Sequence, residues 1–413
     1  MRPKWKTHPW LTFELNLSGV TPAVWMKLGE ARSKCQHLKG IPLRPSVSKE
    51  LHEIFLAKGV HATTAIEGNT LSEAQVLDVL RKKDKTPKSH SYLKTEVNNV
   101  LEAANDILDR VEIHGSKDIS KSEVKNYNKL ILKDMDLEDH VVPGDISRVQ
   151  VGVPGYRGLP VEFCDEALDF LCNWLNRDFQ TDVEDNTVVY GLLKAIVAHV
   201  YLVWIHPFGD GNGRTARLLE VRFLLEAGIP SAAGHLLSNH YNKTRQEYYR
   251  QLARASQNGG DLCGFIDYAV TGFVEQIRDQ LQLVKKQQWD VTWINYIHEL
   301  FYDGSSVTMK RQRKLAIALS AHGGIVAKDA IRSLNPEISN EYSYRGEKTI
   351  SRDLNALVNM KIVEKSPDGY RAKKETVLQF LPRAKQGEAE AQLREAKIIK
   401  EDTAGQLSLP FLS

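Results

Sequence analysis

The strongest constraint on the fold of this 413-residue chain is the apolar run AIVAHVYLVWI, residues Ala195–Ile205. It is too short to span a bilayer and contains His199, so it predicts a helix buried in a protein core. Helical periodicity starts at about Thr187, and a second helix is expected to end near Ala227, where glycine and proline supply a stop signal. The chain is therefore expected to be built around two helices joined by the polar segment His206–Arg217.

The joining segment reads HPFGDGNGRTAR, a mixture that a plain helix or strand does not need. Glycines at the start of the second helix let successive backbone N–H groups point into one concavity, and the helix adds its positive N-terminal end. Two arginines three residues apart can clamp phosphate oxygens. The residues predicted to bind phosphate are Gly211, Asn212, Gly213, Arg214 and Arg217.

Two further side chains of this segment fit a phosphate-centred chemistry. Asp210 offers a hard oxygen ligand suited to Mg²⁺ shared with phosphates. His206 lies beside the anion site and can accept a proton near neutral pH. Each feature alone has an ordinary structural explanation, as a solvent-facing histidine, a tight turn or a solvated arginine pair. Their convergence on one loop favours a reaction in which a hydroxyl loses its proton to His206 and attacks a nucleotide phosphorus.

The segment also resembles a known signature, because His206–Arg217 matches the Fic family motif HPFx[D/E]GNGRxxR at every specified position. The resemblance implies an all-helical core that carries this loop between two helices. It implies transfer of AMP from ATP to a Ser, Thr or Tyr hydroxyl of a target protein. His206 then resembles the general base, Phe208 the core anchor of the loop and Asp210 the Mg²⁺ ligand. Relatives that phosphorylate have lysine after the asparagine, whereas Gly213 makes this chain similar to the adenylylating form.

Two other segments are similar to parts of the Fic family. Val149–Pro160, in a Gly- and Pro-rich region, resembles the family's β-hairpin flap, which could align a target segment by strand addition; the alternative is an ordinary surface hairpin. Residues 242–252 resemble the segment that closes over the adenine. Tyrosines at helical spacing are also typical of a core. The adenine-side candidates are Tyr241, Asn242, Tyr248 and Tyr249.

The stretch TTAIEGN, Thr63–Asn69, resembles the family's inhibitory-helix motif [S/T]xxxE[G/N], which Thr63, Glu67 and Gly68 fit. Glu67 is expected to pair with Arg217. That contact would remove the arginine from the γ-phosphate and put negative charge where the γ-phosphate must lie. A Glu-Gly pair can also be a simple helix C-cap. Combined with the catalytic loop, the motif predicts an enzyme that inhibits itself through Glu67.

The chain as a whole is predicted to be mainly α: a Fic helical core with a short β-hairpin flap, followed by a winged helix-turn-helix domain. Helices are expected to start at Ser72, with Gln75 completing a capping box, and to span about Tyr92–Val111 and Leu262–Lys286. The expected domains are an N-terminal helical region with the inhibitory motif Thr63–Gly68 (1–115), a Fic catalytic core (116–286), a winged helix-turn-helix (287–376) and a polar tail (377–413).

The winged helix is predicted from three helices and a hairpin beyond a boundary in Lys285–Asp303: Lys310–Ala321, Val326–Leu334, Lys348–Met360 and Ile362–Lys373. Residues 310–375 contain 14 Lys/Arg and 8 Asp/Glu, an excess of six positive charges. This basic surface could contact DNA, or it could serve protein docking or dimerisation. The residues expected on the polar side of the recognition helix are Lys348, Thr349, Ser351, Arg352 and Asn355.

Composition narrows the class of protein. The formal net charge is +3, so overall electrostatics do not indicate a nucleic-acid or membrane partner. The four cysteines form neither a CxxC pair nor a metal-like cluster, which fits a reducing compartment. The N-terminus MRPKWKTHPW has no apolar stretch long enough for a signal peptide. Together these features favour a cytoplasmic protein without a membrane partner.

Three functional hypotheses remain open from the sequence. The leading one is a protein adenylyltransferase that uses ATP and Mg²⁺ and modifies a target protein, with itself as an open alternative target. The second is a DNA-binding regulator whose Fic core senses nucleotide. The third uses the same site in reverse, removing AMP from a modified target with Glu67 positioning a water. The target, the signal that relieves inhibition and homodimer formation are not specified by the sequence.

Overall fold

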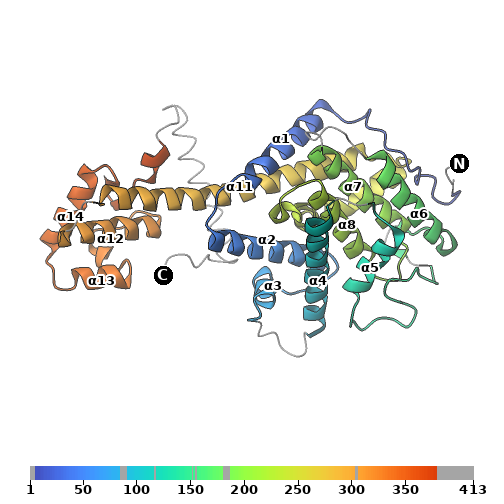
Figure 1. Cartoon of the computed structure of the whole chain (residues 1–413), viewed down its shortest axis with the longest axis horizontal. Coiled ribbons are helices and arrows are strands. Elements are labelled where there is room, and N and C mark those ends of the chain that lie inside the picture. Colours follow the sequence, from blue (N-terminus) through green and yellow to red (C-terminus); the bar gives the residue numbers. More distant parts are fainter. Residues whose placement is uncertain are drawn as a thin grey trace. The chain divides into compact units, whose positions relative to one another are not determined.

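The computed structural model describes residues 5–83, 91–115, 118–150, 152–153, 156–179, 187–302 and 306–378. The chain divides into two compact units, Met1–Leu281 and Gln282–Ser413. Helices predominate in the described ranges (Figure 1), so the predicted mainly helical fold is confirmed. Two antiparallel two-stranded sheets accompany the helices. From residue 379 onward, the predicted polar tail lies outside the described residues.

Four helices precede the central part of the first unit: α1 (Pro22–Lys39), α2 (Pro45–Ile66), α3 (Glu73–Leu80) and α4 (Ser91–His114). The capping box predicted at the start of α3 is present, because the Ser72 hydroxyl accepts from the Gln75 backbone while the Gln75 side chain accepts from the Ser72 backbone. Helix α2 packs against α3, α4 and α9. Its C-terminal end carries the predicted inhibitory motif.

The centre of the first unit is formed by α5 (Lys121–Ile131), α6 (Val161–Asp178), α7 (Thr187–Ile205) and α8 (Asn212–Glu226). By length and composition α7 could cross a membrane, but most of it is buried, and it packs against α1, α6 and α8. It is therefore the core helix that the apolar run predicted. Helix α8 is in turn covered by α4 and α5 and also contacts α7 and α2.

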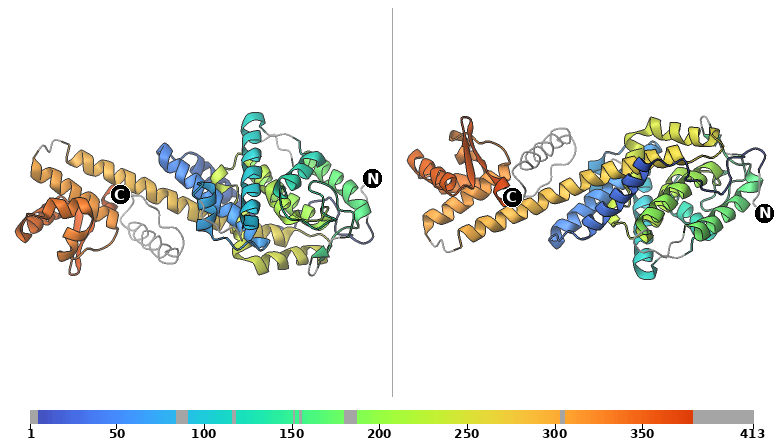
Figure 2. Two further views of the ribbon diagram at one scale, coloured as in Figure 1. Left: turned by 90° about the horizontal axis from the view of Figure 1, so that it is seen from below. Right: turned by 90° about the horizontal axis from the view of Figure 1, so that it is seen from above.

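Between α5 and α6 lies a short hairpin of β1 (Gly152–Val153) and β2 (Tyr156–Arg157), in the segment where the sequence predicted a flap. The unit continues with α9 (Leu236–Lys243), α10 (Arg245–Gln257) and the long helix α11 (Cys263–Leu300). Figure 2 shows α11 as one unbroken helix. The predicted helix Leu262–Lys286 is thus too short, because α11 continues with buried Trp293 and Ile297 at helical spacing.

The second unit contains α12 (Val307–His322), α13 (Pro336–Tyr342), α14 (Glu347–Asn359), β3 (Val363–Ser366) and β4 (Gly369–Ala372). The hairpin and two of its three predicted helices are present, but the helix predicted over Val326–Leu334 is wrong. Val326 exchanges both backbone hydrogen bonds with Tyr370 of β4 and is extended, and only a 3₁₀ turn (Asp329–Ser333) follows. The helix starts later, at Pro336, where the Asn335 side chain caps it.

A buried carboxylate holds these three helices together. Asp353 of α14 is fully buried and accepts hydrogen bonds from Arg311 (2.6 and 3.1 Å) and Gln312 (2.9 Å) of α12 and from the Tyr342 hydroxyl (2.9 Å) of α13. An apolar cluster that includes Leu315 and Leu354 surrounds it. Since four donors from two other helices converge on one carboxylate, Asp353 fixes the three helices relative to one another.

Candidate functional site

The predicted catalytic loop turns sharply between α7 and α8. The backbone of His206 is in the left-handed region, with φ 53°, and so is that of Gly211, with φ 77°. A side chain at residue 211 would also meet Asn128 and Ile131 at 3.0 Å, so glycine is required there by conformation and by space. Helix α8 begins at Asn212, which puts Gly213 in its first turn.

Two asparagines hold the loop in this shape. The Asn212 amide donates to Phe208 O (2.7 Å) and accepts from Phe208 N (2.9 Å), so its side chain is used to clasp the loop. The fully buried Asn128 of α5 donates to Asp210 O (2.9 Å) and accepts from Gly144 N (2.9 Å). Asn128 could not be predicted from the sequence, because nothing in the sequence near it indicates a contact with a loop 82 residues away.

The flanks of the hairpin are fixed to the same loop. Ser147 N donates to Pro207 O (2.9 Å), and Ile146 forms a β-bridge with Phe208. On the other side, Leu159 N donates to Ile205 O (3.2 Å). The hairpin therefore starts and ends at the catalytic loop, as a flap beside the site requires.

His206 has the tautomer and the charge that a proton acceptor needs. Its Nδ1 lies 3.2 Å from Val203 O, and since a carbonyl oxygen can only accept, the proton is assigned to Nδ1 and Nε2 is left free to accept one. Burial lowers the pKa of His206 below 6.5, against the opposing effects of the Val203 hydrogen bond and the Glu67 and Asp210 charges. The imidazole is therefore neutral at neutral pH.

The first turn of α8 supplies an anion site. The backbone N–H groups of residues 212–214 have no partner inside the helix, and the positive end of the helix dipole lies there. Arg214 adds a guanidinium whose Nη2 lies 3.1 and 3.2 Å from the two carboxylate oxygens of Asp210. Asp210 is 45% exposed, so its carboxylate can also reach a cation from solvent. An accessible hard oxygen ligand beside an anion site fits Mg²⁺.

Glu67 makes the contact predicted for it. Its Oε1 accepts from Arg217 Nη2 at 2.5 Å, and Arg217 is further held by the hydroxyl (2.6 Å) and the carbonyl oxygen (3.1 Å) of Thr63. Burial opposes ionisation of Glu67, but Arg217, with help from Arg214 and Arg245, keeps the pKa of the Glu67 carboxyl below 4.5. The carboxylate is therefore charged at neutral pH.

The position of this carboxylate coincides with the anion site. A Cβ atom added to Gly213 would lie 2.3 Å from Glu67 Oε1 and 3.1 Å from Arg217 Nη1. The Glu67 oxygen thus lies directly against the first turn of α8. A negative group is stabilised there by the same N–H groups that would bind a phosphate.

The four adenine-side candidates separate into two pairs. Tyr241 and Tyr248 are buried in the core, where the Tyr241 hydroxyl donates to Glu220 (2.9 Å) and the Tyr248 hydroxyl lies 2.9 Å from His199 Nε2. Their prediction as adenine contacts is therefore wrong, since neither side chain reaches the surface. Asn242 is partly exposed and Tyr249 is 48% exposed, so both remain accessible to a ligand.

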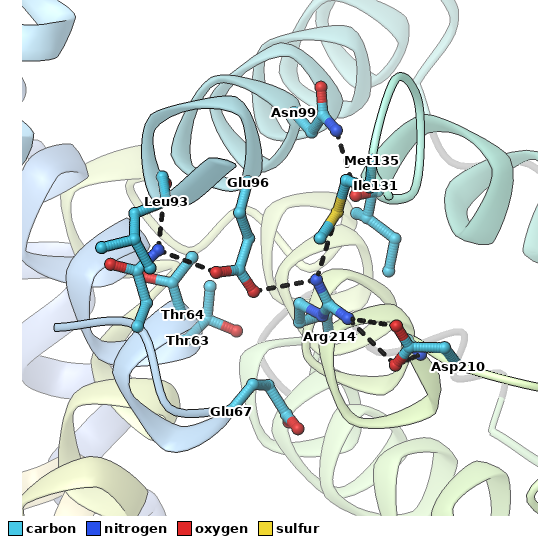
Figure 3. Close-up of polar contacts among 12 residues, drawn as sticks. Thr63, Thr64, Glu67, Leu93, Glu96, Asn99, Ile131, Met135, Asp210 and Arg214 are labelled. Atoms are coloured by element: carbon cyan, nitrogen blue, oxygen red, sulfur yellow. Dashed lines mark hydrogen bonds and ion pairs between the residues drawn. The ribbon is translucent and has the colours of Figure 1, made fainter. Parts of the chain in front are cut away.

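A second residue that the sequence analysis missed is Glu96 of α4. Its carboxylate contacts Arg214 of the loop, as Figure 3 shows. The same figure shows Glu67 and Thr63 on the facing segment. Helical periodicity assigns Glu96 no role, because a charged residue on a long helix is ordinarily solvated.

Comparisons with known proteins agree with this geometry. Residues 118–224 match the model of the Fic/DOC family. Protein adenylyltransferase fic-1 of Caenorhabditis elegans is 29% identical over 253 residues, which cover 61% of this chain and 46% of the relative. Protein adenylyltransferase Fic of Nematostella vectensis is 28% identical over 245 residues, which cover 59% of this chain and 52% of the relative. The chain thus spans about half the length of these curated relatives.

Solved structures resemble this one as well. Fic-1 of Caenorhabditis elegans (residues 134–508 of that protein) is 26% identical with a TM-score of 0.50, over 64% of this chain and 73% of the other. A Fic family protein from Desulfovibrio desulfuricans G20 has a TM-score of 0.52 over 90% of this chain and 98% of the other. At 17% identity, the second likeness concerns the fold alone.

Proposed function

Because residues 118–224 match the model of the Fic/DOC family, we propose that this chain is a protein adenylyltransferase, which transfers AMP from ATP to a Ser, Thr or Tyr hydroxyl of a protein. The observation that carries the proposal is the position of a neutral His206 beside the anion site at the start of α8. The relatives named protein adenylyltransferase support the same reaction.

The proposed reaction uses residues already described. His206 Nε2 takes the proton of the target hydroxyl, and the hydroxyl oxygen attacks the α-phosphorus of ATP. The bond from this phosphorus to pyrophosphate breaks, so AMP becomes attached to the target and pyrophosphate leaves. The first-turn N–H groups of α8, Arg214 and Arg217 bind the phosphates. Asn212 contributes its backbone, since its side chain is engaged with Phe208.

Asp210 is the residue proposed to hold Mg²⁺. A bound Mg²⁺ would offset phosphate charge during the transfer. Asp210 lies at the mouth of the anion site, and its backbone carbonyl is held by Asn128, so its position is fixed by the fold. The flap is proposed to pair with an extended target segment, and Asn242 and Tyr249 remain the candidates for the adenine side.

We further propose that Glu67 inhibits the enzyme. Its carboxylate lies against Gly213 and binds Arg217, so it uses the positive groups that the γ-phosphate needs. ATP can still approach, but like charges disfavour the position of its phosphates that leads to transfer. Glu67→Gly should therefore raise transfer, because it removes the competing negative charge.

The test is incubation of wild type, Glu67→Gly and His206→Ala with Mg²⁺ and α-labelled ATP, with and without cell lysate. Glu67→Gly should label protein and His206→Ala in the Glu67→Gly background should not. His140→Ala, a surface histidine, is the matched control and should leave labelling unchanged. If Glu67→Gly labels no more than wild type at any ATP concentration, the inhibitory role of Glu67 is wrong.

The same samples address the alternatives. Absence of label in every lane would favour the reverse reaction, removal of AMP from a modified target, which is then tested by release of AMP from that target. Label on the enzyme itself would identify it as its own substrate, and dependence of inhibition on protein concentration would indicate a homodimer.

The four free cysteines are consistent with the proposed cytoplasmic location.

A second candidate function belongs to the second unit, which we propose is a winged helix-turn-helix that binds DNA. Lys348, Arg352 and Asn355 are exposed on α14, and Tyr344 just before it is 99% exposed. The β3–β4 hairpin follows α14 in the order that a wing requires.

Retention on duplex DNA tests this proposal. Wild type should be retained at low salt and released as salt rises, and Lys348→Ala with Arg352→Ala should weaken retention. Lys310→Ala, which removes an exposed charge from α12, should have a smaller effect. Absence of retention at low salt would instead favour a protein-docking unit.

A further inference from the structure

Glu96 lies between the two segments that the proposed function uses. It belongs to α4 and is only 7% exposed. Its Oε1 accepts from Arg214 Nη1 at 2.8 Å (Figure 3). Its Oε2 accepts from Asn69 Nδ2 at 2.7 Å. One buried carboxylate therefore connects the catalytic loop with the turn that follows α2.

The Asn69 side of this connection fixes the turn that carries Glu67. Asn69 also donates to Leu93 O (3.0 Å) and accepts from Leu71 N (3.0 Å), and its own N–H donates to Thr64 O (3.1 Å). It is buried and lies two residues after Glu67. The chain that leaves α2 is thus tied to α4 through the Asn69 side chain.

The Arg214 side fixes a phosphate-binding group. Besides Glu96, Arg214 contacts the Asp210 carboxylate and lies 3.7 Å from Met135 Sδ, while its Nε has no hydrogen-bond partner in the described part of the chain. Asp210 is half-exposed and is the residue proposed to bind Mg²⁺. Glu96 is therefore the carboxylate that can keep Arg214 in place when Asp210 turns to the cation.

We propose that Glu96 is a positioning residue with two partners: it orients Arg214 toward the phosphates and, through Asn69, holds Glu67 in its inhibitory place. The proposal rests on the proposed nucleotide transfer. Both partners are donors, so both oxygens of residue 96 must accept. Glutamine has one acceptor and one donor, so both contacts would be weakened: its oxygen would face Arg214 without a negative charge, and its NH2 group would face the buried donor of Asn69.

The two contacts of Glu96, with Arg214 and with Asn69, can be separated experimentally in two backgrounds, wild type and Glu67→Gly. In the Glu67→Gly background there is no inhibitory carboxylate to hold, so only the contact with Arg214 affects the binding of ATP. Glu96→Gln should then raise the KM for ATP by about tenfold and change kcat less. In the wild-type background the same change should raise labelling several-fold at saturating ATP, since it also frees the turn that carries Glu67. Asn69→Ala should raise labelling in wild type and leave the KM for ATP in Glu67→Gly unchanged.

Binding of a fluorescent ATP analogue provides a readout that does not need transfer. Glu96→Gln in the Glu67→Gly background should weaken it by a similar factor, so the result holds even if Glu67→Gly transfers nothing. Glu102→Gln, an exposed glutamate on the same helix, is the matched control. The proposal is overturned if Glu96→Gln changes ATP affinity less than twofold, or if Asn69→Ala leaves wild-type labelling unchanged. Should Glu96→Gln not fold, the Asn69→Ala result decides alone.

Discussion

At the scale of single residues, the proposed inhibition depends on a carboxylate that occupies a site suited to a phosphate. Glu67 lies on the positive end of α8 and against Arg217, a place that suits a phosphate equally well. Gly213 makes this arrangement sterically feasible, because any side chain there would collide with the Glu67 carboxylate. The glycine that fits the adenylylating form of the motif is thus also a contact surface for the inhibitory residue.

Gly213→Ala should therefore behave oppositely in two backgrounds. In wild type the new Cβ would lie 2.3 Å from Glu67 Oε1, so the change should destabilise the protein. In Glu67→Gly that clash is gone, and alanine in a helix is favoured over glycine by about 1 kcal/mol. Urea unfolding of the four proteins should give a coupling energy of roughly 1–3 kcal/mol. Equal effects in both backgrounds would contradict the observed position of Glu67.

The pH dependence of transfer follows from His206. Burial lowers its pKa below 6.5, and the base must be neutral to work, so activity should be full above that pKa and fall as pH drops through it. Removing Glu67 removes a charge that raises the pKa, which shifts this limb further to the acid side. Initial rates of transfer by Glu67→Gly between about pH 5 and pH 8 measure the position of this acid limb. An acid limb centred above pH 6.5 would show that His206 is not the base in the assigned environment.

At the scale of elements, some contacts are readable from sequence and others are not. The loop motif and the Glu67–Arg217 pair could be predicted because the required residues stand within two short patterns. Asn128 and Glu96 could not, since their roles arise from contacts with residues that are distant in the sequence. Tyr248 illustrates a further limit, because helical spacing does not distinguish a tyrosine that faces a ligand from one that faces the core.

The second unit shows the same limit for secondary structure. Val326–Leu334 has helical spacing, but Val326 pairs with Tyr370, which lies 44 residues away and makes the chain extended there. The local signal that was correct is Asn335-Pro336, a cap followed by the residue best suited to the first helical position. Tertiary pairing outweighed periodicity, whereas capping chemistry marked the true start of the helix.

Asp353 provides the stability prediction for these elements. Asp353→Ala would leave the buried Arg311 guanidinium without its carboxylate, so we expect a loss of about 3–5 kcal/mol in the free energy of unfolding of the second unit. Chemical denaturation of the full chain measures it. Asp368→Ala at the exposed hairpin turn is the control, expected within about 0.5 kcal/mol of wild type. A small effect of Asp353→Ala would mean that Arg311 finds another partner.

At the scale of the whole molecule, the two proposed functions belong to different units of the chain. The residues assigned to the reaction and to its inhibition, from Thr63 to Tyr249, belong to the first unit, and the basic helix α14 belongs to the second. Helix α11 contributes buried residues to both, with Ile277 and Leu281 in the first and Trp293 and Ile297 in the second. A continuous helix joins them, but each unit has its own apolar core.

Independent cores predict independent failure. In the Glu67→Gly background, Asp353→Ala should lower the temperature of one unfolding transition, followed by circular dichroism, because it removes the buried anchor of α12, α13 and α14. The temperature at which labelling activity is lost should stay the same, since that activity needs only the first unit. Gly211→Ala forces a side chain into the left-handed turn against Asn128. It should lower the temperature at which activity is lost and leave the unfolding transition of the second unit unchanged. If Asp353→Ala lowered both temperatures together, the two units would have to unfold as one, and they would not be independent in stability.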